Sequence, residues 1–458
     1  MPAQTAPTLD RERLGRLMAR EEAAFIDAHP RSGELYRRAK GSLLAGVPMN
    51  WMVKWAGAYP VFVAEAEGAH FRDVDGHDYV DLCLGDTGAM TGHSPAPTVE
   101  AVRRQVARGI TTMLPSEDAA LVGEELQRRF GLHYWQFTLS ATDANRFAIR
   151  LARMLTGRRK ILVFDYCYHG SVDETFATIV DPASGRVGAR RGNIGPAVDP
   201  GETTRVVQFN DVAALDAALA IGDVAAVLAE PALTNIGIVL PEPGFHDAMR
   251  ELTRRYGTLL INDETHTICT GPGGYTRAHG LDPDMLVIGK AIGGGIPAGT
   301  YGFTEEVGER ISANIELEDC DVGGIGGTLA GYMLSLTAVR ATLTEVLTEA
   351  AFERMIPLAE RWEAGVNDVL GPSAVPWHVT RLGARAEYHF SPTPPRTGAE
   401  AAAAGDFPLE RFLHLYAMNR GILMTPFHNM ALMSPTTVAA DVDRHTEVFR
   451  AAVAELFE

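Results

Sequence analysis

Two residues of opposite charge end apolar, strand-like runs of the sequence and could do chemistry together. Asp263 ends the run TLLIND, and Lys290, 27 residues later, ends MLVIGK. Neither ion is easily buried alone, so one interpretation is a salt bridge across a sheet edge. The other is a site in which the amine bonds covalently to an aldehyde and the carboxylate keeps a heterocyclic nitrogen protonated. The chain has only four lysines, and the other three, Lys40, Lys54 and Lys160, do not end such runs.

Three neighbouring segments favour the second interpretation. The stretch LSATDANRFAIRLAR (139–153) runs from small and hydroxyl residues into a helix, whose first N–H groups could hold a phosphate or merely form an ordinary cap. Tyr168 and His169 follow the run ILVF, where an aromatic ring could stack on a flat cofactor or pack in the core. Thr328 lies in the Gly-rich stretch GGIGGTLAGYML, a second possible phosphate contact. Together these segments predict a pyridoxal-phosphate site, and the sequence has no GxGxxG, P-loop or HExxH alternative in the required context.

A sheet must bring these segments together. Short apolar runs alternate with helix-like segments, including 211–220 and 243–256, which predicts a parallel sheet covered on both faces. Ligands collect at the carboxyl ends of such strands, where Asp165, Glu230, Asp263 and Lys290 all fall. The predicted strands are 161–164, 205–209, 224–230, 258–263 and 285–289.

The flanking sequence predicts a second, smaller domain. The stretch 71–82 alternates around Asp75-Gly76, which predicts a hairpin; a calcium loop is the other interpretation, but its remaining ligand positions are absent. The first 25 residues and the stretch 336–346 have helical spacing, and 391–406 is typical of a surface excursion. We expect an N-terminal helix with part of the small domain over 1–85, a large domain over 86–335, and the rest of the small domain over 336–458.

Composition narrows the classes of function. The 458 residues carry a formal charge of −17, which argues against a dedicated nucleic-acid binder and against adhesion to anionic membranes. The four cysteines lack CxxC spacing. The sequence also has no long uncharged apolar run and no apolar leader segment at its start. We therefore expect a cytoplasmic protein without a metal site, without a membrane span and without a disulfide scaffold.

At this point the chain resembles a known family, the class III (ω-type) pyridoxal-phosphate aminotransferases. It is most similar to the branch that holds glutamate-1-semialdehyde aminomutase and β-amino-acid aminotransferases. The resemblance runs from about residue 46 to 444 and rests on seven motifs in order: FRDVDGHDYVDL, SATDANRFAIRLAR, YHG, AEP, DETHT, DMLVIGKAIGGGIPAG and GGTLAGYML. It implies an α/β enzyme of fold type I, with a mainly parallel sheet in the large domain and a smaller α+β domain made from both chain ends. It also implies a homodimer with shared active sites.

The resemblance assigns roles residue by residue. Lys290 is the covalent lysine, and Asp263 is the partner of the pyridine nitrogen. The remaining implied cofactor contacts are Ser140, Ala141 and Thr142 at the phosphate, Tyr168 and Thr265 on the two ring faces, His169 beside Tyr168, Asn235 near the phenolic oxygen, and Thr328 reaching the neighbouring subunit's phosphate. His266 and Tyr332 depart from the family's usual residues.

The substrate is less well defined by the resemblance. The family's carboxylate-binding arginine is missing from GVPMNWM (46–52) and from MTPFHNM (424–430). The residues implied instead are Trp51, Asp86, Phe427, His428 and Arg385, with Arg277 as a further source of charge. We expect a transaminase that moves an amino group from an amine or amino acid to a carbonyl acceptor. The alternatives are an aminomutase of the glutamate-1-semialdehyde type, a racemase, or a catalytically silent binding protein.

Overall fold

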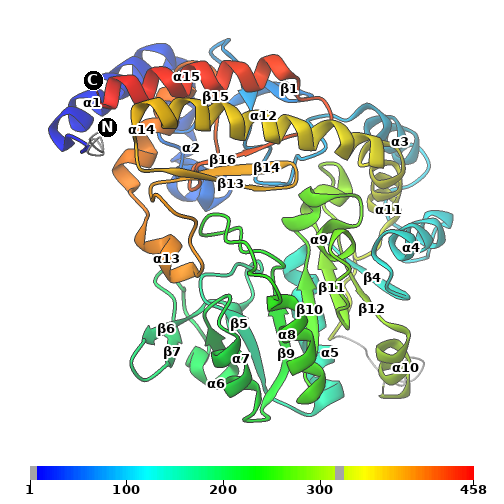
Figure 1. Ribbon diagram of the computed structural model, residues 1–458. Coiled ribbons are helices and arrows are strands. Elements are labelled where there is room, and N and C mark those ends of the chain that lie inside the picture. Colours follow the sequence, from blue (N-terminus) through cyan, green and yellow to red (C-terminus); the bar gives the residue numbers. More distant parts are fainter. Residues whose placement is uncertain (1–7, 315–323, 458) are drawn as a thin grey trace. The chain divides into compact units, whose positions relative to one another are not determined.

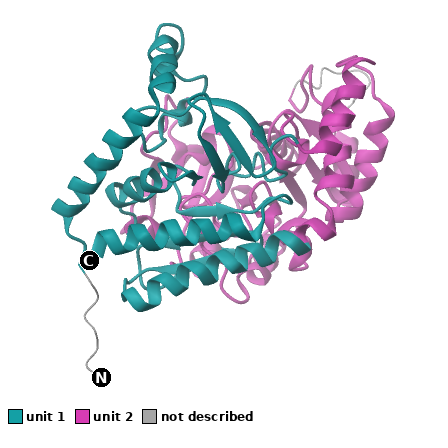
Figure 2. Cartoon of the chain, turned by 90° about the horizontal axis from the view of Figure 1, so that it is seen from above, with its two compact units in different colours: residues 1–94, 353–394, 404–458 teal, residues 95–352, 395–403 magenta. Residues whose placement is uncertain are grey.

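The chain divides into two compact units in a computed structural model that describes residues 8–314 and 324–457. Unit 1 comprises residues 1–94, 353–394 and 404–458, and unit 2 comprises 95–352 and 395–403 (Figure 2). The smaller unit is therefore assembled from both ends of the chain. Its limits fall at 94/95 and 352/353, where the sequence analysis placed them at 85/86 and 335/336.

Unit 2 is built on a seven-stranded sheet of order β4-β12-β11-β10-β9-β5-β8 (Figure 1). The five strands from β11 to β8 in this order pair in parallel, and β12 runs antiparallel to both of its neighbours. The strands are β4 (Tyr134–Thr138), β5 (Lys160–Phe164), β8 (Thr204–Val207), β9 (Val224–Ala229), β10 (Leu259–Asp263), β11 (Met285–Ile288) and β12 (Gly299–Phe303). All residues of β9 to β12 are buried, which explains their continuous apolar sequence. The predicted mainly parallel sheet is confirmed.

Helices and a small hairpin complete unit 2. The predicted helices 211–220 and 243–256 correspond to α7 (Val212–Leu219) and α8 (Phe245–Arg255). The other helices are α3 (Ala96–Val106), α4 (Glu117–Phe130), α5 (Ala141–Thr156), α6 (Pro200–Thr203), α9 (Gly274–Ala278), α10 (Glu305–Asn314), α11 (Met333–Ala341) and α13 (Gly398–Ala403). Strands β6 (Ala177–Asp181) and β7 (Arg186–Ala189) form the hairpin, and the 3₁₀ turns are η3 (Asp173–Thr175), η4 (Thr267–Thr270) and η5 (Lys290–Gly293). The predicted helix over 336–346 changes at Thr342 into a π-helical turn, η6 (Thr342–Val346).

Unit 1 contains two small sheets, of order β1-β2-β3-β15 and β13-β14-β16. Its strands are β1 (Val63–Glu67), β2 (His70–Asp73), β3 (Asp78–Asp81), β13 (His378–Leu382), β14 (Arg385–His389), β15 (Ile422–Leu423) and β16 (Met430–Leu432). Its helices are α1 (Arg11–Ala28), α2 (Pro30–Ala39), α14 (Phe407–Met418) and α15 (Ala439–Phe457), with most of α12 (Glu349–Ser373) and the 3₁₀ turns η1 (Leu44–Gly46) and η2 (Asn50–Val53). No helix in the described ranges has both the length and the apolarity that a membrane crossing requires.

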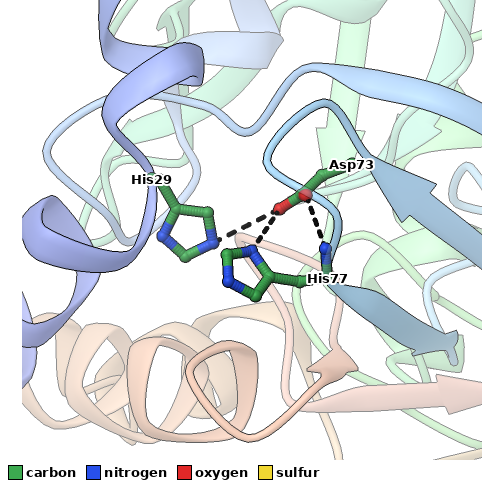
Figure 3. Close-up of side chains that lie close together, drawn as sticks. All are labelled: His29, Asp73 and His77. Carbon is green, nitrogen blue, oxygen red and sulfur yellow. Dashed lines mark hydrogen bonds and ion pairs between the residues drawn. The ribbon is translucent and has the colours of Figure 1, made fainter.

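The predicted hairpin of β2 and β3 carries a buried polar network (Figure 3). One oxygen of Asp73 accepts the backbone N–H groups of Asp75 and His77, each at 2.9 Å, which closes the turn. The other oxygen lies 3.1 Å from His77 Nδ1 and 3.4 Å from His29 Nε2, and accepts the Tyr79 hydroxyl at 3.0 Å. His29 Nε2 also lies 2.7 Å from that hydroxyl. The trio His29, Asp73 and His77 has the spacing of metal ligands, but its facing atoms are engaged in hydrogen bonds that tie the corner between α1 and α2 to the hairpin.

Candidate active site

Asp263 and Lys290 reach the same edge of the unit 2 sheet. Strands β10 and β11 are parallel neighbours, with Asp263 paired to Val287. Asp263 ends β10, and Lys290 stands just past β11 at the start of η5. The backbone of Lys290 has φ of 49°, in the left-handed region that a side chain makes unfavourable. Such strain persists where the surroundings impose it, often at functional sites.

Asp263 is buried in a ring of hydrogen-bond donors. Its Oδ2 accepts Asn145 Nδ2 at 2.8 Å and lies 2.9 Å from His169 Nδ1, and its Oδ1 accepts the Thr265 N–H at 3.1 Å. Burial alone would raise the pKa of Asp263, but the hydrogen bond and charge of His169 outweigh it and lower that pKa. Burial also opposes the charged form of His169, yet the neighbouring Cys167 and Asp263 raise its pKa to about 10. The pair therefore holds an ionised carboxylate inside the protein at neutral pH.

The start of α5 forms a close-fitting cradle. The first N–H groups of any helix have no intrahelical acceptor, and here they belong to the segment after Ser140, whose hydroxyl caps Asp143 N. Glycines approach this turn: a Cβ on Gly170 would lie 2.1 Å from Thr142 Oγ1, and one on Gly289 would lie 2.9 Å from Ala141 N. Ser140, Ala141 and Thr142 remain partly exposed. This turn has the free N–H groups and the open surface that a phosphate requires.

The remaining predicted cofactor contacts in unit 2 lie in loops that follow the strands. Tyr168 and His169 follow β5, and the Tyr168 N–H donates to Glu230 Oε1 at 2.9 Å. Asn235 follows β9 and is partly buried, whereas Thr265 follows β10 and is buried. Thr328 is exposed and stands five residues before α11.

One contact at the lysine was missed by the sequence analysis. The Nζ atom of Lys290 lies 2.7 Å from Nε2 of His266, a residue that is 6% exposed. Asn145, which bonds Asp263 and also donates to the His169 carbonyl at 3.1 Å, was missed as well. For Asn145, the available signal in the sequence was an asparagine among the apolar residues of the helical segment 139–153. The imidazole of His266 was visible only as an unusual neighbour of the acid.

Unit 1 contains an apolar pocket of about 460 Å³. Trp51 and Phe427 line it, with their rings in an edge-to-face arrangement 5.5 Å apart. Asp86 also lines it and is the single charged side chain among the described residues that do so. The Lys54 ammonium lies 5.1 Å from the centre of the Phe427 ring. The pocket thus combines aromatic walls with one carboxylate.

The basic residues named as candidates for the substrate site occupy different settings. Arg385 is fully buried, donates to the Thr87 hydroxyl, and lies 3.9 Å from Asp86. His428 is buried beside Glu387, with Nδ1 and Oε1 3.5 Å apart. Arg277 lies on the surface of unit 2, 3.9 Å from Glu349. Asp86 and Arg385 thus partly balance each other's charge within unit 1.

The residues at the sheet edge fit pyridoxal phosphate. The set supplies an amine that can bond an aldehyde, a buried carboxylate for a pyridine nitrogen, and a helix start with closely approaching glycines for a phosphate. This fit rests on the chemistry of the donor set and on the cradle that a Cβ on Gly170 or Gly289 would fill.

Comparisons with known proteins agree with this fit. The family described as aminotransferase class-III matches residues 52–453. The chain is 34% identical to a glutamate-1-semialdehyde 2,1-aminomutase of Sorangium cellulosum, over 94% of this chain and 98% of that protein. The crystal structure of a glutamate-1-semialdehyde aminomutase from Pseudomonas aeruginosa superposes with a TM-score of 0.95 at 52% identity, covering 98% of this chain and 99% of the other.

A second solved structure widens the range of relatives. An ω-transaminase from Sphaerobacter thermophilus matches with a TM-score of 0.84 at 29% identity, covering 93% of this chain and 98% of the other. The predicted fold type I of pyridoxal-phosphate enzymes and the resemblance stated above are confirmed. The chain belongs to the class-III aminotransferase family.

Proposed function

We propose that this protein uses pyridoxal phosphate to transfer an amino group, and that its reaction is the isomerisation of glutamate 1-semialdehyde or a close analogue. The use of pyridoxal phosphate is supported by the placement of Lys290 and Asp263 at the ends of two adjacent strands. The 52% identity to an aminomutase over nearly the whole chain supports the second. The sequence analysis favoured a transaminase and kept this reaction as the alternative; the comparisons favour the alternative.

Each residue of the sheet edge has a role in this proposal. Bound pyridoxal phosphate supplies an aldehyde for amino groups and a ring that accepts electrons. Lys290 provides the covalent attachment and, when a substrate amine displaces it, carries a proton between carbon atoms. Asp263, kept ionised by His169 and Asn145, holds the pyridine nitrogen protonated. The N–H groups at the start of α5 bind the phosphate.

A second candidate is a transaminase whose amino donor is an apolar amine. The pocket of unit 1 supports it, because Asp86 is the charged group among its described lining residues. A carboxylate-binding site would favour an arginine, whose planar fork pairs both oxygens. A carboxylate beside Trp51 and Phe427 suits an ammonium group with aromatic bulk instead.

One experiment separates the two reactions. The purified protein, loaded with cofactor, is mixed in turn with glutamate 1-semialdehyde, an aryl-alkyl amine and a β-amino acid, and the visible absorbance is followed. Isomerisation of the semialdehyde without an added acceptor would support the aminomutase. Fast reaction with the amine, and turnover only when a keto acid is added, would support the transaminase. A spectrum that none of the three changes would refute both.

A further inference from the structure

We propose that His266 is a positioning residue for Lys290: its imidazole accepts a hydrogen bond from the lysine amino group and holds that group where it exchanges protons. The inference rests on Lys290 being the cofactor lysine, as proposed above. It adds a partner for that lysine which neither the family resemblance nor the comparisons assign.

The first step is the geometry of the pair. Nε2 of His266 and Nζ of Lys290 are 2.7 Å apart, a short hydrogen-bond distance between two nitrogens. His266 is held by its backbone, because it precedes η4 and its carbonyl accepts the N–H of Cys269 at 3.3 Å. The register of β10 and β11 then fixes the loop that carries His266 beside the one that carries Lys290.

The second step is the charge of the pair. Two cations at 2.7 Å would repel strongly, so a contact this short fits a pair that carries a single positive charge. An ammonium donates and never accepts, whereas a neutral imidazole has one accepting nitrogen. The arrangement that fits is a Lys290 ammonium donating to a neutral His266. A hydrogen bond to the charged form stabilises that form.

Carboxylates on neighbouring segments accept hydrogen bonds from groups of their own. Glu264 accepts from the Thr267 hydroxyl at 2.5 Å and from the N–H groups of residues 275 and 276, Glu230 accepts from Tyr168 and Thr234, and Asp263 faces the imidazole of His169. Lys290 itself lies against the imidazole of His266.

The third step is the consequence for proton transfer. When Lys290 acts as a base, a proton leaves a substrate carbon for Nζ, and the electron pair of the C–H bond stays with the substrate. The ammonium formed is the species that His266 stabilises. Nζ later gives the same proton to a second carbon and is neutral again, so protons and electrons balance over the cycle. His266 therefore strengthens Lys290 as a base and limits its rotation.

The test measures how readily the Lys290 amine reacts. The chain contains four lysines, so competitive acylation of the cofactor-free full-length protein, followed by peptide mass spectrometry, gives a separate reaction rate for each amine. Wild type, His266→Ala and His266→Gln are compared. The exposed His279, which stacks on Tyr275 in the same unit, supplies the matched control His279→Gln. Thermal unfolding checks that all variants fold.

We expect the Lys290 amine to be acylated about tenfold faster in His266→Ala than in wild type, because a hydrogen bond to the unreactive ammonium is lost. His266→Gln retains an accepting oxygen and should restore most of the wild-type rate. Acylation of Lys160, partly buried in the same unit, should not change in any variant. In the loaded enzyme, kcat should fall about tenfold in the alanine variant, in proportion to the lost basicity, with KM little changed and partial rescue by glutamine.

Acylation of Lys290 that is no faster in a folded His266→Ala variant than in wild type would overturn the proposal. So would a glutamine variant no better than alanine, because a shared accepting atom could then not be the cause. Loading of wild type with pyridoxal phosphate tests the proposed function separately. If no visible band forms on Lys290, the proposed function fails, while the acylation result still decides whether the two side chains are coupled.

Discussion

The buried pair of His169 and Asp263 gives a stability prediction that can be worked from the structure. His169 donates from Nδ1 across 2.9 Å to the carboxylate. Against the opposing effect of burial, Cys167 and Asp263 raise its pKa from an ordinary 6.5 to about 10. A histidine whose folded-state pKa is raised contributes stability that is complete below about pH 6.5 and is lost as the pH rises toward the folded value. Replacing His169 by glutamine removes this titration but leaves an N–H donor for Asp263.

The magnitude follows from the width of the pH window. Each pH unit between the unfolded and folded pKa is worth about 1.4 kcal/mol. Between pH 6.5 and pH 9 the contribution of His169 to the free energy of unfolding should therefore fall by about 3 kcal/mol. This agrees in order of magnitude with the ~3–5 kcal/mol that breaking a buried ion pair costs.

The assay is urea unfolding of the cofactor-free full-length protein at several pH values from 6.5 to 9. The quantity of interest is the difference in unfolding free energy between wild type and His169→Gln, which cancels all other titrations. His246→Gln is the matched control, since burial lowers the pKa of His246 to about 4. That residue is neutral in the folded state across this range, and in the unfolded state it is almost fully neutral above about pH 7.5. A wild-type advantage over His169→Gln that stays constant with pH would refute the charged pair. The charged pair would also be refuted if the difference in unfolding free energy from wild type changed with pH equally for His169→Gln and His246→Gln.

Three further predictions concern the candidate site. Lys290→Ala should abolish the visible band of the lysine-bound cofactor and lower activity by at least about 10²–10⁴-fold without unfolding the protein, as absorbance and circular dichroism will show; normal turnover would contradict its role. Asp263→Asn should retain cofactor but lose most of its activity, because an amide cannot stabilise a protonated pyridine nitrogen, and steady-state rates equal to wild type would exclude that function. The protein should sediment as a homodimer or larger, with Thr328 contributing to its partner's site, and an active monomer in sedimentation velocity at assay concentration would disprove shared sites.

The sequence predicted the elements whose signals are local. The continuous apolar strands and the helices between them were found to within a few residues, and so was the edge that carries Asp263 and Lys290. The strands β4 and β12 were not predicted. β12 is the short segment GTYGF, and its burial comes from pairing with β11 on one side and β4 on the other. That pairing joins residues far apart in the chain, which no local period reveals.

In the candidate site too, the residues with a local sequence signal were predicted and those that depend on distant partners were not. Lys290 and Asp263 end recognisable strands, whereas Asn145 and His266 act through partners 118 and 24 residues away. Local pattern places Asn145 on a helix but says nothing about which carboxylate it meets. Arg385 was one of the candidates for binding an acidic substrate, and that role stays a prediction. Nothing in the sequence indicates its neighbours: it stands on the central strand of a small sheet and lies buried beside Thr87 and Asp86.

The two ends of the chain meet in unit 1, and this determines the order in which the protein can assemble during synthesis. Strand β3 pairs in parallel with β15, and Glu21 on α1 accepts hydrogen bonds from Asn419 and Arg420 near the end of α14. The first 94 residues therefore leave the ribosome long before the strand and helix that complete their unit. Residues 95–352, nearly all of unit 2, emerge about 70 residues before β15, which at ~5–20 residues per second is several seconds earlier. During that interval the nascent chain carries a unit able to fold, preceded by an unfinished hairpin whose open edge must be shielded until β15 arrives.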